Sequence, residues 1–168
     1  MKQSVKKGIF LAVCIAVIVC IFPAKVRAAV GFESVDLYYY AFDDTGQAYF
    51  DAEKFCFYGN FTDTQKASIL YENLFDHTDP DKISFVPEGT MLLGLEIEGD
   101  VLILNVSGDI KKYGGTAYET ALLKQIGLNA LNFPGVKRLT LMIDSNYQLL
   151  PEGKFVYEYE IGALLTAH

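Results

Sequence analysis

One histidine lies within a short acidic stretch and is the first candidate for metal or acid–base chemistry. His77 stands among Asp76, Asp79 and Asp81. A zinc site needs three or four convergent ligands, and the only other imidazole belongs to His168. The spacing also misses the calcium-loop pattern, which requires a central glycine and a glutamate at its twelfth position. We therefore interpret the stretch as a solvated loop, and we predict no metal site and no cofactor.

Carboxylates and a cysteine elsewhere could act as catalytic groups. Asp43, Asp44 and Asp51 could form a carboxylate pair for glycoside hydrolysis. The run from Asp43 to Gly46 is equally typical of a turn, because aspartate hydrogen-bonds to its own turn and glycine accepts positive φ. Cys56 would be a nucleophile only beside a base that lowers its pKa, and no such residue is close in sequence. We therefore predict no catalytic residues and expect a protein that is not an enzyme.

Glycine pairs and a tyrosine run could bind ligands without catalysis. Gly114 and Gly115 precede an expected helix, and free amides at a helix start favour anions. Room for the chain to turn is the simpler explanation of this pair. A similar anion site could form at Ser107-Gly108. The run Tyr38-Tyr39-Tyr40 could stack on a sugar, although we favour a core strand with one tyrosine at its rim.

Length, composition and charge restrict the class of protein. The chain has 168 residues, 51% of them hydrophobic, which is room for one ordinary domain and is not typical of a disordered chain. There is no glycine-rich phosphate-binding motif. Fourteen basic residues stand against 21 acidic ones. This balance does not favour a nucleic-acid partner, which requires a basic patch.

The N-terminal segment is typical of a secretory signal peptide. Three lysines precede an apolar run over 9–22, and small residues then lead to Ala28 and Ala29. We predict a signal peptide over 1–28, cleavage between these two alanines, and a single domain over 29–168. A retained membrane anchor is the alternative. The protein is then expected outside the cytoplasm, either secreted or on the outer face of the cytoplasmic membrane.

The remaining chain alternates strand and helix patterns. Thr62 and Gln65 form a capping box, and Thr116 and Glu119 are expected to form a second one. Phe133-Pro134-Gly135 should end the second helix, with Phe133 buried and the turn serving a structural purpose. Strands are expected over 35–42, 47–57, 91–97, 101–106, 137–143 and 155–161, and helices over 62–76 and 116–132. The order predicts an α+β two-layer domain, with a mainly antiparallel sheet packed by two helices.

Three segments together resemble the GerMN domain of sporulation and spore germination proteins. They are Val86-Pro87-Glu88-Gly89-Thr90-Met91-Leu92-Leu93-Gly94, Tyr113-Gly114-Gly115-Thr116-Ala117-Tyr118-Glu119, and Asn132-Phe133-Pro134-Gly135-Val136. The similarity extends over residues 36–153. It implies a fold like that of ring-building domains of secretion machines, and a structural role for Gly114, Gly115, Thr116, Glu119, Phe133, Pro134 and Gly135.

The resemblance also implies a function. It favours a non-catalytic interaction module outside the cytoplasm that contributes to a cell-envelope, sporulation or germination assembly. Its partners would be envelope or spore-assembly proteins, or further copies of itself, with no nucleic acid, and with the membrane only if the signal segment is retained. The alternative is a small secreted binder or hydrolase of cell-wall glycan. Two close carboxylates beside a tyrosine in a pocket would favour the alternative, whereas a flat, aromatic-rimmed face would favour the module.

Overall fold

The computed structural model describes residues 31–77, 79 and 82–166. The expected signal segment with Ala28 and Ala29 therefore lies outside the described residues, as do Asp81 and His168. The described residues fall into two units, of which the smaller joins 31–33 to 57–60. The larger unit contains 34–56 and the described residues from 61 onwards.

A two-stranded sheet opens the described chain. Strand β1 (Phe32–Phe42) pairs with β2 (Ala48–Tyr58). The turn between them is organised by Asp43, whose carboxylate accepts hydrogen bonds from the backbone N–H groups of Thr45 (2.8 Å) and Gln47 (2.9 Å). These hydrogen bonds, together with the one from the Thr45 hydroxyl, lower the pKa of Asp43. The expected turn is confirmed, and it explains Asp43 without catalysis.

Helix α3 (Asp63–Phe75) begins at the predicted capping box. The Thr62 hydroxyl accepts from the backbone N–H of Gln65 (3.2 Å), and the Gln65 side chain accepts in return from the backbone N–H of Thr62 (2.9 Å). The buried side of the helix consists of Ala67, Leu70, Tyr71 and Leu74. Their spacing of three and four residues is the one that places side chains on a single helix face.

Replacing Thr62 with alanine should cost about 1 kcal/mol of stability, because the first turn of α3 loses its side-chain cap. The loss should appear as a lower midpoint in urea, with an unchanged slope of the unfolding transition. Thr62→Ser keeps the hydroxyl acceptor and should restore most of the stability. Equal losses in both variants would show that the cap makes no contribution.

The second sheet is mixed and forms the framework of the larger unit. Its strands run in the order β3-β4-β5-β6, and β7 also pairs with β5. They are β3 (Leu92–Glu98), β4 (Val101–Val106), β5 (Arg138–Ile143), β6 (Asn146–Tyr147) and β7 (Tyr159–Glu160). The β3–β4 hairpin is antiparallel as expected, whereas β4 and β5 run parallel. A parallel pair needs a long crossover, and here it contains a helix.

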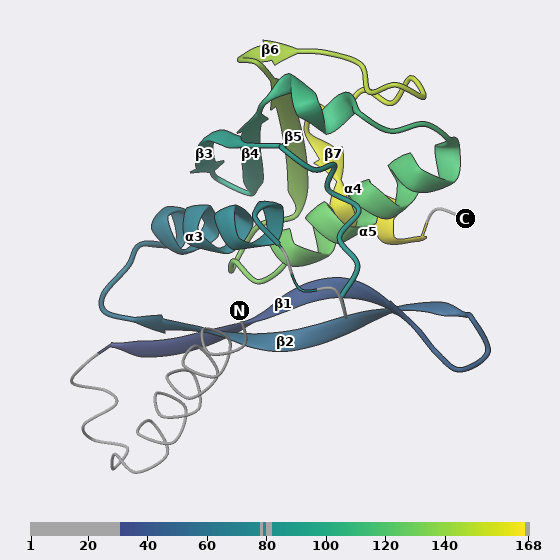
Figure 1. Cartoon of the computed structure of the whole chain (residues 1–168). Helices are drawn as coiled ribbons and strands as arrows, with labels where there is room; N and C mark the ends of the chain where they lie inside the picture. The colour runs from purple at the N-terminus through teal and green to yellow at the C-terminus, as the bar shows by residue number, and fades with distance from the viewer. Residues whose placement is uncertain (1–30, 78, 80–81, 167–168) are drawn as a thin grey trace, which may run out of the picture. The chain divides into compact units, whose positions relative to one another are not determined.

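That crossover contains a short 3₁₀ helix, η1 (Gly108–Lys111), and the helix α4 (Thr116–Ala130), while α5 (Ile161–Thr166) ends the described chain. Helices α3 and α4 lie on one side of the mixed sheet (Figure 1). The core lies between sheet and helices, and its fully buried side chains include Leu102, Leu104, Leu122, Ile126 and Leu139. The predicted α+β class, with a sheet packed by two main helices, is confirmed.

Two local predictions were wrong. The capping box at Thr116 does not form: the helix N-cap is Gly115, with φ 97°, and no side chain caps it. Glu119 is instead buried, and it accepts hydrogen bonds from the Tyr113 hydroxyl (2.8 Å) and the backbone N–H of Glu152 (2.9 Å). The strand expected over 155–161 is limited to β7, because the chain enters α5 at Ile161.

Side-chain amides of α4, and of Asn132 just beyond its end, hydrogen-bond to one edge of β1. Asn132 accepts from the backbone N–H of Asp36 (3.1 Å) and donates to its carbonyl (2.6 Å). Asn129 does the same for Tyr38, at 3.0 and 3.1 Å. Gln125 donates to the Tyr38 carbonyl (3.2 Å) and accepts from the backbone N–H of Phe85 (2.8 Å). We call these three side chains the amide ladder. At Asp36 and Tyr38 they take the place of a neighbouring strand, and the ladder ends where Tyr40 forms an antiparallel bridge with Ile83.

Candidate functional site

The face of the mixed sheet opposite the core carries the site that we consider functional. Pairing across the strands places side chains of this face in rows. The first row is Glu98, Val101, Arg138 and Glu160; the second is Glu96, Ile103 and Thr140; the third is Gly94, Asn105, Met142 and Tyr147. Because alternate residues of a strand share a face, these rows describe the whole outer surface of the sheet.

The segment before β7 closes one end of this face. Arg138 makes ion pairs with Asp100 and Glu158. The backbone N–H of Glu158 donates to the Thr140 hydroxyl (2.8 Å), and Thr140 is buried. Val101, in the first row, is buried as well. Strand β4 is therefore covered on both sides at Val101, whereas Ile103 and Asn105 on the outer side are only half-buried.

The other end of the face remains open as a shallow hollow of about 330 Å³. Gly94 has no side chain there, so nothing projects from the middle of β3. Ile103 and Met142 supply apolar surface, and Tyr147 is 53% exposed. We call this surface the open face; the side chains that line it around Gly94 are Glu96, Glu98, Ile103, Asn105, Met142 and Tyr147.

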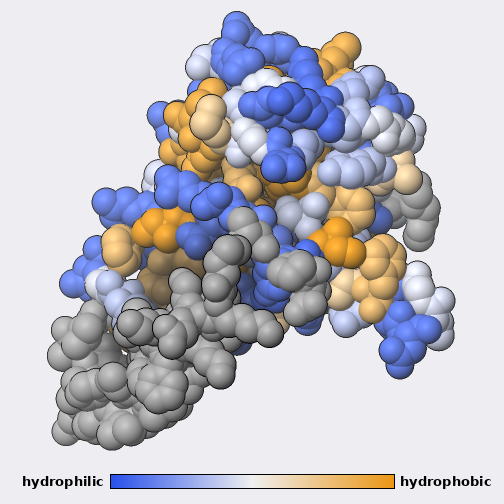
Figure 2. Space-filling view, in the orientation of Figure 1, coloured by the Kyte–Doolittle hydropathy of each residue, from blue (hydrophilic) through white to orange (hydrophobic). Residues whose placement is uncertain are grey.

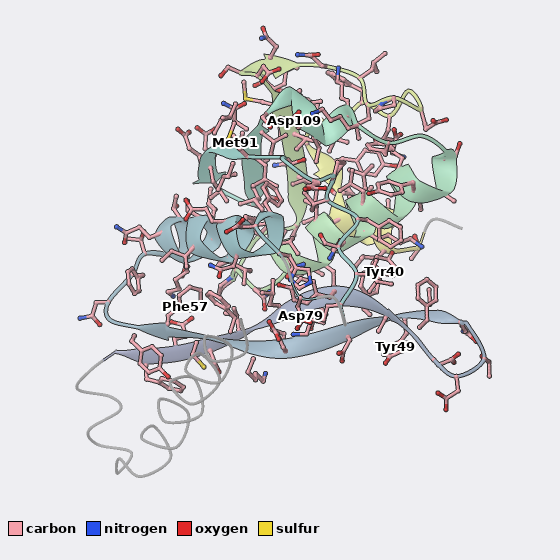
Figure 3. The ribbon with its side chains drawn as sticks, viewed as in Figure 1. Tyr40, Tyr49, Phe57, Asp79, Met91 and Asp109 are labelled. Carbon is pink, nitrogen blue, oxygen red and sulfur yellow. The ribbon has the colours of Figure 1, made fainter. Side chains whose placement is uncertain are left out.

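An aromatic rim extends the open face beyond Tyr147. The rings of Tyr147 and Tyr157 meet edge to face with 5.2 Å between centroids, and Phe155 stacks on Tyr157 at 6.3 Å. All three side chains are about half exposed. Further apolar residues gather over β3 at the sheet edge (Figure 2), where Met91 projects beside the strand (Figure 3). Exposed aromatic groups of this kind mark interaction surfaces more often than isolated apolar residues do.

The charge of the open face is negative. Glu96 and Glu98 are exposed, and within the described part of the chain no ion pair joins either of them to a basic residue. The cation of the same surface, Arg138, is already neutralised by Asp100 and Glu158. A hydrogen bond from Arg138 holds the pKa of the Asp100 carboxyl below its usual value of 3.8.

This pKa shift predicts how acid affects stability. Because the folded-state pKa of Asp100 is lowered, its ion pair stabilises the fold above pH 3.8, and the contribution is lost as pH falls through the folded-state value. Asp100→Asn should therefore lower the melting temperature at neutral pH. The difference between variant and wild type should shrink as pH falls from about 5 to about 2.5. A difference that stays constant over this range would contradict the assignment.

The described part of the His77 loop, which leaves out Asp81, gives His77 neighbours within the protein. The His77 Nε2 atom lies 3.3 Å from the carbonyl oxygen of Lys82, and its ring packs on Tyr39 with 4.3 Å between centroids. No group of three His, Cys, Asp or Glu side chains among the described residues could hold a metal ion. Burial and the nearby Asp79 charge raise the pKa of Tyr39 to about 12, so its hydroxyl stays protonated.

The structure also places the candidate carboxylates, the cysteine and the tyrosine run named in the sequence analysis. Asp44 and Asp51 are exposed, and Cys56 is a half-buried free thiol. Tyr39 and Tyr40 are buried, and Tyr40 points from β1 toward α4 (Figure 3). These two rings therefore cannot serve as an open surface on which a sugar stacks.

Both proposed anion sites are occupied by the chain's own carboxylates. The backbone N–H of Gly115 donates to Glu152 Oε1 (2.8 Å). The backbone N–H of Gly108 donates to Asp144 Oδ1 (3.0 Å). The amides at these helix starts therefore serve to hold loops that come from after β5. The sequence suggested anion binding at Gly114-Gly115 and Ser107-Gly108 only as a possibility, with a turn as the simpler explanation of Gly114-Gly115, and it did not indicate that the chain itself supplies the carboxylates.

Comparison with known proteins identifies the family. The Germane family model, described as "Sporulation and spore germination", matches residues 36–148. The chain therefore belongs to the Germane family, which confirms the resemblance to GerMN domains. In a search of curated proteins, no significant match was found.

Two solved structures share the fold. The first GerMN domain of the sporulation protein GerM from Bacillus subtilis matches with a TM-score of 0.54 and 16% identity, covering 75% of this chain and 96% of that one. The tandem GerMN domains of the same protein match with a TM-score of 0.58 and 13% identity, covering 77% of this chain and 45% of that one. This chain thus spans less than half of the tandem structure. None of the described helices is long and apolar enough to cross a lipid bilayer.

The open face was not located by sequence reasoning. Its members are spread over β3, β4, β5 and β6, and β6 is too short to give a recognisable strand pattern. Gly94 within the expected strand was the one available signal, because a strand glycine often marks a bulge or a close approach. A bulge does occur between Leu92 and Gly94.

Proposed function

We propose that this protein is a non-catalytic interaction module that acts outside the cytoplasmic membrane, in a cell-envelope, sporulation or germination assembly. The observation that carries the proposal is the family match over 36–148. The N-terminal segment supports the location, because its pattern is that of a secretory signal. The open face, with its aromatic rim, supports an interaction role.

The experiment is cross-linking in cells followed by capture of the tagged protein from sporulating and vegetative cultures. The double variant Met142→Ala and Tyr147→Ala removes the apolar floor and rim of the open face. Tyr49→Ala is the matched control, since Tyr49 is a similarly exposed tyrosine on β2 (48% against 53%). We expect an envelope or spore-assembly protein to be captured by the wild type and the control, but not by the double variant. Equal capture by all three would contradict this use of the open face.

One observation favours the glycan-hydrolase alternative. Glu96 and Glu98 lie two residues apart on the same face of β3, and Tyr147 lines the same hollow. Both carboxylates are exposed to water, whereas a general acid needs surroundings that retain its proton at neutral pH. We therefore expect no new reducing ends when the protein is incubated with cell-wall glycan strands. Release that disappears in Glu96→Gln would establish the alternative.

A further inference from the structure

The size of the open face points to a small ligand group. The hollow of about 330 Å³ lies at the lower end of the range of ligand pockets, which is about 300–1,000 Å³. A carbon placed at the Cβ position of Gly94 would meet the Cβ of Asn105 at 3.9 Å, an ordinary van der Waals distance, so the surface is not crowded at this point. Such a hollow has room for one long side chain and not for a folded surface.

The chemistry of the lining changes along the hollow. Ile103 and Met142 form an apolar floor, Glu96 and Glu98 form an acidic wall on β3, and the half-exposed ring of Tyr147 stands on β6. A side chain that fits must therefore be apolar along its stem and positively charged at its end. Arginine and lysine have this construction, since they bury their methylene stems and keep the charged head in a polar setting.

Charge complementarity indicates that the ligand group is positively charged. Glu96 and Glu98 carry two negative charges that no basic residue in the described ranges neutralises through an ion pair. Arg138, on the same surface, is held by two carboxylates and cannot move to them without breaking both pairs. A cationic head would gain charge-assisted hydrogen bonds from the glutamates. The Tyr147 ring could add a cation–π contact.

We propose that the open face binds an arginine or lysine side chain presented by a protein partner. The proposal rests on the function proposed above and specifies the chemistry of the partner at this surface. The cationic head lies against Glu96 and Glu98, and the stem lies on Ile103 and Met142. The aromatic rim at Tyr147 then contacts the residues of the partner that flank the cation.

The test uses the exported protein, labelled for NMR, and a short acetylated and amidated peptide with the sequence Gly-Arg-Gly-Arg-Gly. The matched probe replaces both arginines with citrulline, which has nearly the same shape and no charge. We expect the arginine peptide to shift the backbone amide signals of Gly94, Glu96, Asn105 and Met142. The double variant Glu96→Gln and Glu98→Gln should weaken this binding by about tenfold, which corresponds to about 1.4 kcal/mol.

The control variant is Asp44→Asn with Asp51→Asn, which removes two exposed carboxylates from the β1–β2 hairpin and should leave binding unchanged. Equal shifts with the citrulline peptide, or equal weakening in the control variant, would overturn the cationic assignment. Failure of this inference is distinguishable from failure of the proposed function. If the Glu96→Gln/Glu98→Gln variant still captures the cellular partner while Met142→Ala/Tyr147→Ala does not, the module stands and the cationic ligand is wrong.

Discussion

Replacing Phe133 with alanine is expected to lower the free energy of unfolding by about 3–5 kcal/mol. Phe133 is only 2% exposed and follows the end of α4, where its backbone N–H donates to the carbonyl of Ala130 (3.2 Å). Truncation removes the ring from the core and leaves a cavity. A loss of this size is a large share of a typical total stability of about 5–15 kcal/mol. Chemical denaturation of the purified protein measures it.

Leu131 provides the control for Phe133. Leu131 is also apolar and lies two positions earlier, but it is 46% exposed. Leu131→Ala should therefore change stability by less than about 0.5 kcal/mol. The segment Phe133-Pro134-Gly135 remains a structural turn in our interpretation: Gly135 adopts φ 88°, and the backbone N–H of Val136 donates to the carbonyl of Phe133 (3.1 Å). An unchanged midpoint in Phe133→Ala, combined with lost partner binding, would show instead that Phe133 is a recognition residue.

Asn129→Ala should have the second largest effect, a loss of about 2–4 kcal/mol. Asn129 is fully buried in the amide ladder, and its side-chain oxygen accepts the hydrogen bond of the Tyr38 backbone N–H (3.0 Å). The Tyr38 carbonyl keeps the hydrogen bond from Gln125. Most of the cost therefore arises from one partly buried donor that loses its acceptor, together with the cavity left by the lost side chain.

A second asparagine on a helix serves as the control for Asn129. Asn73 on α3 is exposed, and its side chain donates only to the carbonyl of Ile69, one turn earlier (2.7 Å). Asn73→Ala should stay within about 0.5 kcal/mol of the wild type. Hydrogen exchange at the Tyr38 amide gives an independent readout, since its protection should fall in Asn129→Ala and not in Asn73→Ala. Unchanged protection at Tyr38 would contradict the role assigned to the amide ladder.

Short-range sequence patterns correctly predicted those helix and strand ends that depend on residues close together in the chain. Thr62 and Gln65 are three residues apart and satisfy each other, so the start of α3 could be read from the sequence. Strand β4 was expected over 101–106 and occupies these residues, five of which are apolar. The same reasoning failed at Glu119. Its carboxylate accepts from the Tyr113 hydroxyl and also from the backbone N–H groups of Glu152 and Lys154, which are more than 30 residues away in the chain.

Long-range pairing explains what the sequence could not predict of the candidate site. β6 contains only Asn146 and Tyr147, and it is a strand because β5 lies beside it. The end of the chain contains alternating aromatic residues, which favoured a strand, yet only Tyr159–Glu160 pair with β5. The open face depends on both of these pairings, since β6 brings Tyr147 to Met142 and the segment before β7 closes the other end. The position of the open face therefore could not be predicted from local sequence patterns.

The amide ladder has a consequence for how the family can vary in length. Successive residues of an α-helix are rotated by about 100°, so one extra residue between Gln125 and Asn132 would turn part of the ladder away from β1. An extra residue in the turn after Asp43 would leave the ladder intact. Natural relatives are therefore expected to accept insertions and deletions at the hairpin turn, while the helical interval that faces β1 keeps a constant number of residues.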